Sequence, residues 1–222
     1  MARRRQPRSA PDESPETAGL SDEALMMAVR DGTIDYFGVL LRRYETRVIT
    51  FAYRMVGNYE TARDILQQAF MKILERAGHY EARAQFSTFL YQVTRNLCIN
   101  ELKRSARRRS VSLDQEMYSD AGQVTFLRDV LPDDTGTPEE KLILEESRNA
   151  VRRVIAKLPP IYREVVVLRI FEELPYGEIS KITGAGENTV KSRMRYALER
   201  LQDAMRRAMG AAAKGAGPDE GP

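Results

Sequence analysis

Cysteine and histidine are almost absent from this sequence, which holds only Cys98 and His79 among 222 residues. A single cysteine cannot form an internal disulfide, and no CxxC or HxxxH pair is present to bind zinc. Catalysis by a Cys–His or Ser–His pair would need His79, and a lone histidine is more often structural. No GxGxxG or GxxxxGKS/T phosphate-binding loop occurs either. These absences point away from an enzyme, and we expect no catalytic site, metal or cofactor.

Long apolar runs are also missing. No run approaches the roughly 18 residues that span a bilayer, and Met1–Leu20 has arginines without the apolar stretch of a secretory signal. We therefore expect a cytoplasmic protein with no membrane insertion. Hydrophobic residues make up 42% and charged residues 30%, as in a soluble globular protein with excess charge. The net charge of +3 is too small by itself to indicate nucleic-acid binding, so the distribution of charge matters more.

The pattern of the chain predicts five segments. Helical periodicity occupies residues 21–109 and 137–207, and no β-type alternation is sustained, so we predict an all-α fold with two helical domains. Between them, residues 110–136 hold six acidic residues and one arginine, a net charge of −5, which indicates an extended acidic linker. Residues 1–20 are predicted to be a flexible basic, proline-rich tail, and residues 208–222 a disordered Ala/Gly tail.

Each helical domain is expected to contain four helices. Ser21 is a good N-cap for the first helix, and Thr137-Pro138-Glu139-Glu140 forms a capping box that begins the second domain. The expected helices span about 21–30, 34–56, 59–77, 87–108, 137–158, 161–172, 176–182 and 188–207. The third is predicted to bury an apolar stripe of Leu66, Ala69, Phe70, Ile73 and Leu74.

The last two helices form a helix-turn-helix pattern, because a short amphipathic helix is followed by a glycine-containing turn and a longer helix with basic residues at its start. Apolar residues recur along the longer helix at Val190, Met194, Ala197 and Leu201, and this stripe is expected to face the core. The basic and polar residues lie off that stripe, where they are expected to reach duplex DNA rather than only water. The predicted duplex contacts are Asn188, Thr189, Lys191, Ser192, Arg193, Arg195 and Tyr196.

The helix that begins near Ser87 gives a second nucleic-acid signal. Its apolar stripe is Phe86, Leu90, Val93 and Leu97, and a polar and basic stripe runs along another face. Amides, arginines and an aromatic ring beside a basic helix suit unstacked bases. The predicted single-strand contacts are Tyr80, Arg83, Gln85, Asn96, Asn100, Lys103, Arg104 and Arg107. For Tyr80, a place in the core is an equally good interpretation.

The helix expected at 59–77 carries amides and a methionine on one face, which suits a helical protein partner as well as a plain solvated surface. The residues of this face are Asp64, Gln67, Gln68, Met71 and Glu75.

Five motifs in order resemble bacterial sigma factors of the extracytoplasmic-function (ECF) type, in the sigma-70 family. They are Ala62–Phe70, Phe86–Tyr91 with Arg95-Asn96-Leu97, Leu158–Arg163 with Leu168-Arg169, Tyr176–Ile179, and Asn188–Arg193. The resemblance covers roughly Asp22 to Leu201. Two departures are Gln68, where the family usually has an acid, and Pro175, where it often has serine; they put in doubt a charge pair with polymerase and a helix-capping hydroxyl.

The resemblance implies an alternative sigma factor that directs core RNA polymerase to promoters and helps to melt the −10 region. The face from Asp64 to Glu75 would bind the β′ clamp helices, and the second domain would meet the β flap. Asn96, Asn100 and the loop 78–85 would capture −10 bases, while Lys191, Ser192, Arg195 and Tyr196 would read the −35 element. The acidic linker would thread towards the polymerase active site and RNA exit path. An anti-sigma factor is a further partner that such proteins often have.

Chain length is compatible with contacts at both promoter elements. The 27 residues of the linker reach at most ~90 Å at ~3.3 Å each, and two duplex turns span ~70 Å. Two rival functions remain: a stand-alone helix-turn-helix regulator, which would bind duplex DNA tightly without polymerase, and a nuclease, which would need a carboxylate cluster.

Overall fold

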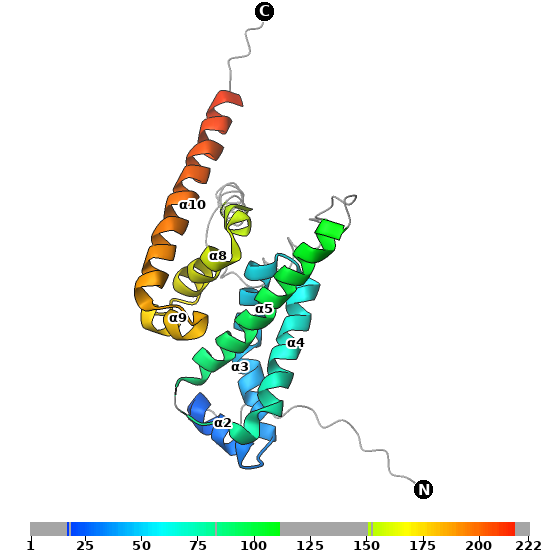
Figure 1. Ribbon diagram of the computed structural model, residues 1–222. Helices are drawn as coiled ribbons and strands as arrows, with labels where there is room; N and C mark the ends of the chain where they lie inside the picture. The colour runs from blue at the N-terminus through cyan, green and yellow to red at the C-terminus, as the bar shows by residue number, and fades with distance from the viewer. Residues whose placement is uncertain (1–16, 18, 83, 112–150, 152, 216–222) are drawn as a thin grey trace, which may run out of the picture.

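The computed structural model describes residues 17, 19–82, 84–111, 151 and 153–215, and within these ranges every regular element is helical. The all-α prediction is therefore confirmed. The elements are α2 (Asp22–Arg30), α3 (Asp35–Val56), α4 (Tyr59–Glu75), the 3₁₀ turn η1 (Ala77–His79), α5 (Phe86–Val111), α8 (Pro160–Val166), the π-helical turn η2 (Val167–Phe171), α9 (Tyr176–Thr183) and α10 (Glu187–Gly215) (Figure 1). The predictions for the N-terminal tail before residue 17, most of the acidic linker, the capping box at Thr137 and Arg83 lie outside the described residues.

Helices α2 to α5 form an N-terminal bundle whose boundaries follow local capping. The Ser21 hydroxyl accepts a hydrogen bond from the Ala24 amide at 3.2 Å, and the Asn58 side chain accepts one from the Thr61 amide at 2.9 Å. Both side chains satisfy amides that the first helical turn leaves without partners. Gly57 ends α3 with φ 77°, a left-handed conformation that glycine adopts without a Cβ clash.

The apolar stripe predicted for α5 is confirmed, since Phe86, Leu90, Val93 and Leu97 are all buried. The stripe predicted for α4 is wrong at one position: Leu74 is 37% exposed, while Ile73 is fully buried. One side of α4 faces the bundle, and its buried residues include Ala62, Ile65, Ala69 and Ile73. Leu74 lies on the neighbouring side of the helix, at the edge of this packed surface.

Elements α8 to α10 form a C-terminal module. Gly184 ends α9 with φ 69° and starts the turn into α10, as the glycine-containing turn predicts. The helix predicted at 161–172 is present, but its last part is a π-turn in which the Glu172 amide donates to Val167 O. Helix α10 extends to Gly215, beyond residue 208, where the sequence predicts the start of the Ala/Gly tail. The run Ala211–Ala213 explains this, because alanine has the highest helix propensity.

The bundle and the module pack directly against each other. Helix α9 lies along α5, and α8 and η2 contact α3 (Figure 1). The recognition-type helix α10 lies on the outer side of the module, packed on α8 and α9. The two helices predicted to contact DNA, α5 and α10, therefore belong to two modules in direct contact.

Candidate nucleic-acid interface

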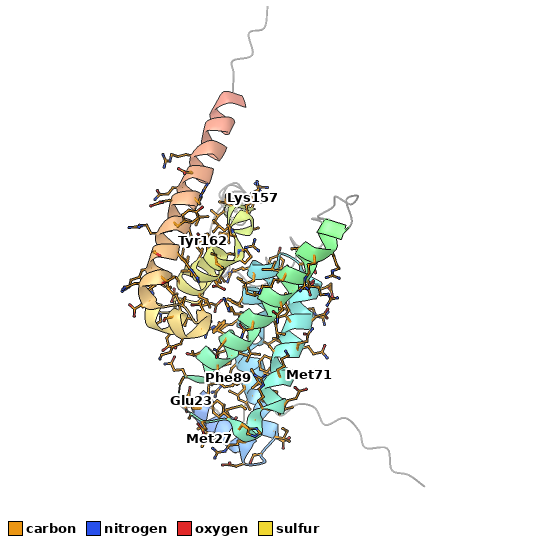
Figure 2. All side chains as sticks on the ribbon, viewed as in Figure 1. Glu23, Met27, Met71, Phe89, Lys157 and Tyr162 are labelled. Atoms are coloured by element: carbon orange, nitrogen blue, oxygen red, sulfur yellow. The ribbon has the colours of Figure 1, made fainter. Side chains whose placement is uncertain are left out.

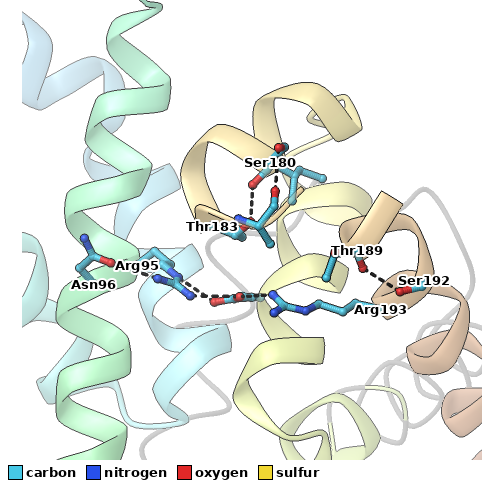
Figure 3. Close-up of polar contacts among 10 residues, drawn as sticks. Arg95, Asn96, Ser180, Thr183, Thr189, Ser192 and Arg193 are labelled. Atoms are coloured by element: carbon cyan, nitrogen blue, oxygen red, sulfur yellow. Dashed lines mark hydrogen bonds and ion pairs between the residues drawn. The ribbon is translucent and has the colours of Figure 1, made fainter. Parts of the chain in front are cut away.

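The first turns of α10 present polar and basic side chains to solvent. Val190, Met194 and Ala197 are buried and Leu201 is half-buried, which confirms the stripe and leaves most of the predicted duplex contacts on the other face. Lys191 forms an ion pair of 2.7 Å with Glu187 one turn earlier. The Ser192 hydroxyl donates to Thr189 O at 3.0 Å (Figure 3). The same face as Lys191 and Ser192 also exposes Asn188, Thr189 and Arg195.

Two of the predicted duplex contacts take part in packing instead. The Arg193 guanidinium lies 3.4 Å from the carboxylate of Glu164, which is fully buried. The ring of Tyr196 packs on Tyr162 with centroids 4.3 Å apart, and its hydroxyl accepts a hydrogen bond from Arg200 at 2.9 Å. In this conformation Arg193 and Tyr196 hold α10 on the module, and only their remaining exposed edges face outward.

The polar stripe of α5 is exposed along its length, with Asn96, Asn100, Lys103, Arg104 and Arg107 all on the surface. The Asn96 side-chain oxygen accepts a hydrogen bond from Arg95 at 3.1 Å. Its amide group and the basic residues that follow are positioned to meet a polar, negatively charged chain.

The loop before α5 places its aromatic residue inside the bundle. Tyr80 is 7% exposed, and its ring lies 6.4 Å from that of Phe86 and 6.0 Å from that of Phe89. Burial raises the pKa of Tyr80 to about 12. Its buried hydroxyl has no hydrogen-bond partner among the described residues. Tyr80 is thus a core residue in this conformation, while Gln85 is exposed.

An open hollow of about 620 Å³ lies beside this loop. Its walls combine Asp22 and Glu23 of α2, Arg43 and Tyr44 of α3, and the loop around Gln85. Arg43 pairs with Asp22 at 2.8 Å, and Tyr44 donates a hydrogen bond of 2.5 Å to the other oxygen of that carboxylate. Glu23 accepts a hydrogen bond from the Phe86 amide at 2.8 Å, so the charged groups named here already have partners.

One face of α4 is exposed along four turns, and it contains all the residues predicted for a protein partner: Asp64, Gln67, Gln68, Met71 and Glu75. Met71 is 54% exposed and lies on the outer side of the bundle, opposite α10 (Figure 2). A further exposed apolar residue, which the sequence pattern does not indicate, is Ile34, 55% exposed just before α3. Exposed apolar side chains beside amides and acids are typical of a protein-binding surface.

Sequence reasoning also missed two buried glutamates, Glu164 and Glu172, which bind arginines across the two modules. The signal was present for Glu164, which directly precedes the apolar run Val165–Leu168. An acid in such a run is expected to be buried, and a buried acid needs a cation. The sequence alone does not say which arginine supplies it.

The described residues lack two further kinds of feature, a metal-ligand cluster and a membrane-crossing helix. They contain no group of three or more His, Cys, Asp or Glu residues that could hold a metal ion. Among the same residues, no helix combines the length and the apolar character that crossing a membrane requires.

Comparisons with known proteins agree on one family. The model of sigma-70 region 2 matches residues 40–108, which hold most of the N-terminal bundle. The model of sigma-70 region 4 matches residues 148–201, which hold the helix-turn-helix.

Curated relatives resemble the chain over most of its length. The ECF RNA polymerase sigma factor SigW of Bacillus subtilis is 31% identical over 178 residues, which are 80% of this chain and 93% of the relative. The RNA polymerase sigma-H factor of Pseudomonas aeruginosa is 28% identical over 83% of this chain and 93% of its own. The ECF sigma-E factor of Escherichia coli K12 is also 28% identical, over 83% and 94%.

Solved structures share the fold. CnrH, solved in complex with the cytosolic domain of CnrY, superposes with a TM-score of 0.60 at 18% identity, over 84% of this chain and 97% of that one. The sigma factor RpoE of Bartonella quintana, solved with the anti-sigma factor NepR, gives a TM-score of 0.60 at 20% identity, over 77% and 96%. The two family models, the extended relatives and the two-module helical fold lead to one conclusion: the chain belongs to the ECF RNA polymerase sigma factors and is an alternative sigma factor.

Proposed function

We propose that the exposed face of α10, from Asn188 to Arg195, reads the −35 element as intact duplex. Helix N-termini attract phosphates, and a recognition helix places its first turns in the major groove. Lys191 and Arg195 lie one turn apart on this face and supply the positive charge. Arg193 and Tyr196 act mainly by holding the helix on α8, since both pack against that helix.

The −10 element is assigned to the polar stripe of α5. Asn96 and Asn100 offer amides that can read the edges of unstacked bases, and Lys103, Arg104 and Arg107 would follow the backbone. Gln85 belongs to the same surface through the loop before α5. Tyr80 contributes to base stacking only if the loop releases it from the core, because its ring is covered by Phe86 and Phe89.

The exposed face of α4 is assigned to core RNA polymerase, in particular to the β′ clamp helices. Its central residue, Met71, can adapt to an irregular partner surface. Glutamine at position 68 lowers the negative charge of this face, so contacts there depend more on Asp64, Glu75 and apolar packing. The C-terminal module would meet the β flap.

The remaining assignments concern class and location. The protein would work in the cytoplasm as a non-enzymatic initiation factor without a metal or cofactor, and an anti-sigma factor would compete for the same surfaces. The observation that carries the proposal is the presence of two separate exposed basic helix faces, on α5 and on the start of α10, in a chain that also exposes a partner-binding face on α4.

Reconstitution tests this function. Purified protein is mixed with core RNA polymerase and a pool of genomic promoter fragments, and transcript starts are sequenced. We expect stable retention by core enzyme and starts at a discrete promoter class. Absence of a complex with core enzyme would refute the proposal, whereas tight specific binding of the free protein to duplex would favour a stand-alone regulator.

A further inference from the structure

Helix α2 carries polar contacts that the sites described so far do not use. It lies before residues 40–108, the part of the chain that the sigma-70 region 2 model matches, and none of the predicted site residues belongs to it. Its first turn holds two neighbouring acidic residues, Asp22 and Glu23. Their side chains bond to two different helices of the bundle, and one of those helices is α5.

Asp22 fixes the first turn of α2 on α3. Its carboxylate accepts a hydrogen bond of 2.8 Å from Arg43 and one of 2.5 Å from the Tyr44 hydroxyl. The side chains of Asp22 and Arg43 are each only 23% exposed. The Tyr44 ring packs edge-on against Phe86, with centroids 5.6 Å apart. The position of Glu23, the next residue, is therefore set by a network that is largely withdrawn from water.

Glu23 caps α5 from a distant part of the chain. Glu23 Oε1 accepts a hydrogen bond of 2.8 Å from the amide of Phe86, 63 residues further along, and Glu23 lies at the end of the bundle where α5 begins (Figure 2). Phe86 is the first residue of α5, and a first-turn amide has no partner within its own helix. A carboxylate at this place also interacts favourably with the helix dipole. In α2 and α4 the cap is local, since Ser21 and Asn58 provide it.

The same helix contacts the other end of the loop that precedes α5. The Arg30 guanidinium, in the last turn of α2, lies 3.5 Å from Tyr80 O. Tyr80 and Phe86, at the two ends of the loop, are both buried. The residues described between them are all exposed: Glu81, Ala82, Ala84 and Gln85. The path of this exposed loop therefore depends mainly on its two ends, and α2 contacts both of them.

The first turn of α5 decides how part of the proposed −10 surface is presented. Gln85 directly precedes Phe86, whereas Asn96 lies about 15 Å further along the helix and Asn100 about 21 Å. A helix that loses its cap frays at the first turn. Such fraying would displace Gln85 and the loop and would leave Asn96 and Asn100 in place. Binding groups must be held within about 0.5 Å of their productive geometry, so this displacement would affect the reading of bases.

We propose that Glu23 is a positioning residue for the −10 element. Through the Phe86 amide it fixes the first turn of α5 and, with it, the loop that meets the unpaired strand. Glu23 acts through the protein and does not itself contact a base. The cap is a property of the free chain, while its effect on −10 discrimination rests on the proposed function.

Two variants separate the hydrogen bond from the charge. Glu23→Ala removes the acceptor, whereas Glu23→Gln keeps a side-chain oxygen at the same reach and loses only the charge. Both variants lose the favourable negative charge in the first turn of α2, so the difference between them reports the cap. Glu45→Ala is the matched control, because Glu45 is an exposed glutamate on α3.

The cap is tested on the free full-length chain by NMR measurement of hydrogen exchange at the Phe86 amide. Loss of a helix cap should accelerate this exchange on the order of 2- to 30-fold in Glu23→Ala, with little change in Glu23→Gln and Glu45→Ala.

Holoenzyme with each variant is then tested for opening of a promoter that transcript-start sequencing has identified. The same promoter with one substituted base in the −10 element is opened in parallel, and the ratio of the two rates measures −10 discrimination. We expect the ratio to fall on the order of 2- to 30-fold in Glu23→Ala and to be restored in Glu23→Gln. A general loss of folded protein would lower both rates together and leave their ratio unchanged.

Three results would overturn the proposal: unchanged Phe86 exchange in Glu23→Ala, an unchanged ratio despite faster exchange, or a lower ratio in Glu23→Gln without faster exchange, which would indicate direct contact with a base. Failure of the proposed function is distinguishable from these. In that case the wild type is not retained by core polymerase, which refutes the effect on −10 discrimination, while faster Phe86 exchange in Glu23→Ala still supports the cap.

Discussion

Arg195→Ala gives the sharpest test of the −35 assignment. Arg195 is exposed on the same face of α10 as Lys191, about 6 Å further along the helix. Within the part of the chain that the structure describes, no carboxylate pairs with Arg195, so its removal should change the free energy of unfolding by less than about 0.5 kcal/mol. Any loss of promoter binding would therefore reflect a lost DNA contact.

The size of the loss depends on what Arg195 touches. A bidentate contact to a base is worth about 1–3 kcal/mol, so its loss would weaken binding by roughly 5- to 150-fold at the cognate promoter only. A phosphate contact would weaken binding to all sequences, and the slope of log affinity against log salt would fall by about 0.9. Both outcomes are consistent with a place in the DNA interface, and they are distinguished by comparing cognate and scrambled −35 sequences.

The assay is fluorescence anisotropy of a labelled promoter fragment titrated with reconstituted holoenzyme between about 50 and 200 mM salt. Arg206→Ala is the matched control, since Arg206 is 76% exposed on the same helix and lies about 16 Å beyond Arg195. If both variants bind cognate and scrambled promoters as the wild type does, or lose the same amount, the assignment of this face is refuted.

Three further predictions follow from other parts of the structure. Glu187→Gln should raise promoter affinity a few-fold, because it frees Lys191 from an exposed ion pair of 2.7 Å and removes a charge that repels phosphates; unchanged affinity in the same anisotropy assay would place Lys191 outside the interface. Glu173→Gly should raise the melting temperature by a few degrees at most. Glu173 has φ 56°, a left-handed conformation that costs a residue with a Cβ about 1–2 kcal/mol, and glycine would remove this cost but lose more conformational freedom on folding. A clear fall of the melting temperature in a calorimetric scan would contradict this. Acid should weaken the contact between α5 and α9, because hydrogen bonding from Thr88, and then the contact with Lys181, lowers the pKa of Glu178 from 4.5. The contribution of Glu178 to stability is complete above the ordinary pKa and is lost as the pH falls through the lowered one, so the melting temperature should fall in that acidic range, and less so in Thr88→Val.

The sequence predicted most of the local structure because local signals decide it. Ser21, Gly57 and Gly184 act within a few residues of their own positions, and the helices begin or end beside them. The stripe of α5 could be predicted for the same reason, since helical periodicity needs no knowledge of the partner. The end of α4 could not, because Leu74 and Ile73 are equally apolar and only the position of the neighbouring helices decides which one is buried.

The candidate site was predictable as a set of residue types, and its organisation was not. Asn96, Lys191 and Arg195 are exposed, as an interface requires, but their patterns do not reveal that Arg193 would turn toward Glu164 or that Tyr80 would be covered. These placements depend on contacts between segments far apart in the chain. The interface of the two modules is invisible to periodicity for the same reason: Glu172 and Tyr91 are 81 residues apart.

Glu164 and Glu172, the two buried glutamates between the bundle and the module, are expected to respond differently to mutation. The named partners of Glu172 all belong to the bundle: the Tyr91 hydroxyl donates to it, and Arg47 and Arg54 lie 3.5 and 3.7 Å away. Glu164 instead pairs with Arg193 of its own module and with Arg95 of the bundle.

Glu164→Gln should therefore weaken the module itself as well as its contact with the bundle, because the ion pair that positions α10 on α8 is removed. We expect a lower melting temperature and weaker −35 binding, whereas Glu172→Gln should lower the melting temperature and leave −35 binding by the holoenzyme unchanged. Removing one partner of a buried pair typically costs about 3–5 kcal/mol, and the exposed edge of Arg193 places the expected loss at or below the lower end of that range. If Glu164→Gln lowered the melting temperature as much as Glu172→Gln does and left −35 binding intact, Arg193 would not depend on Glu164 for its position, and the distinction between the two glutamates would be wrong.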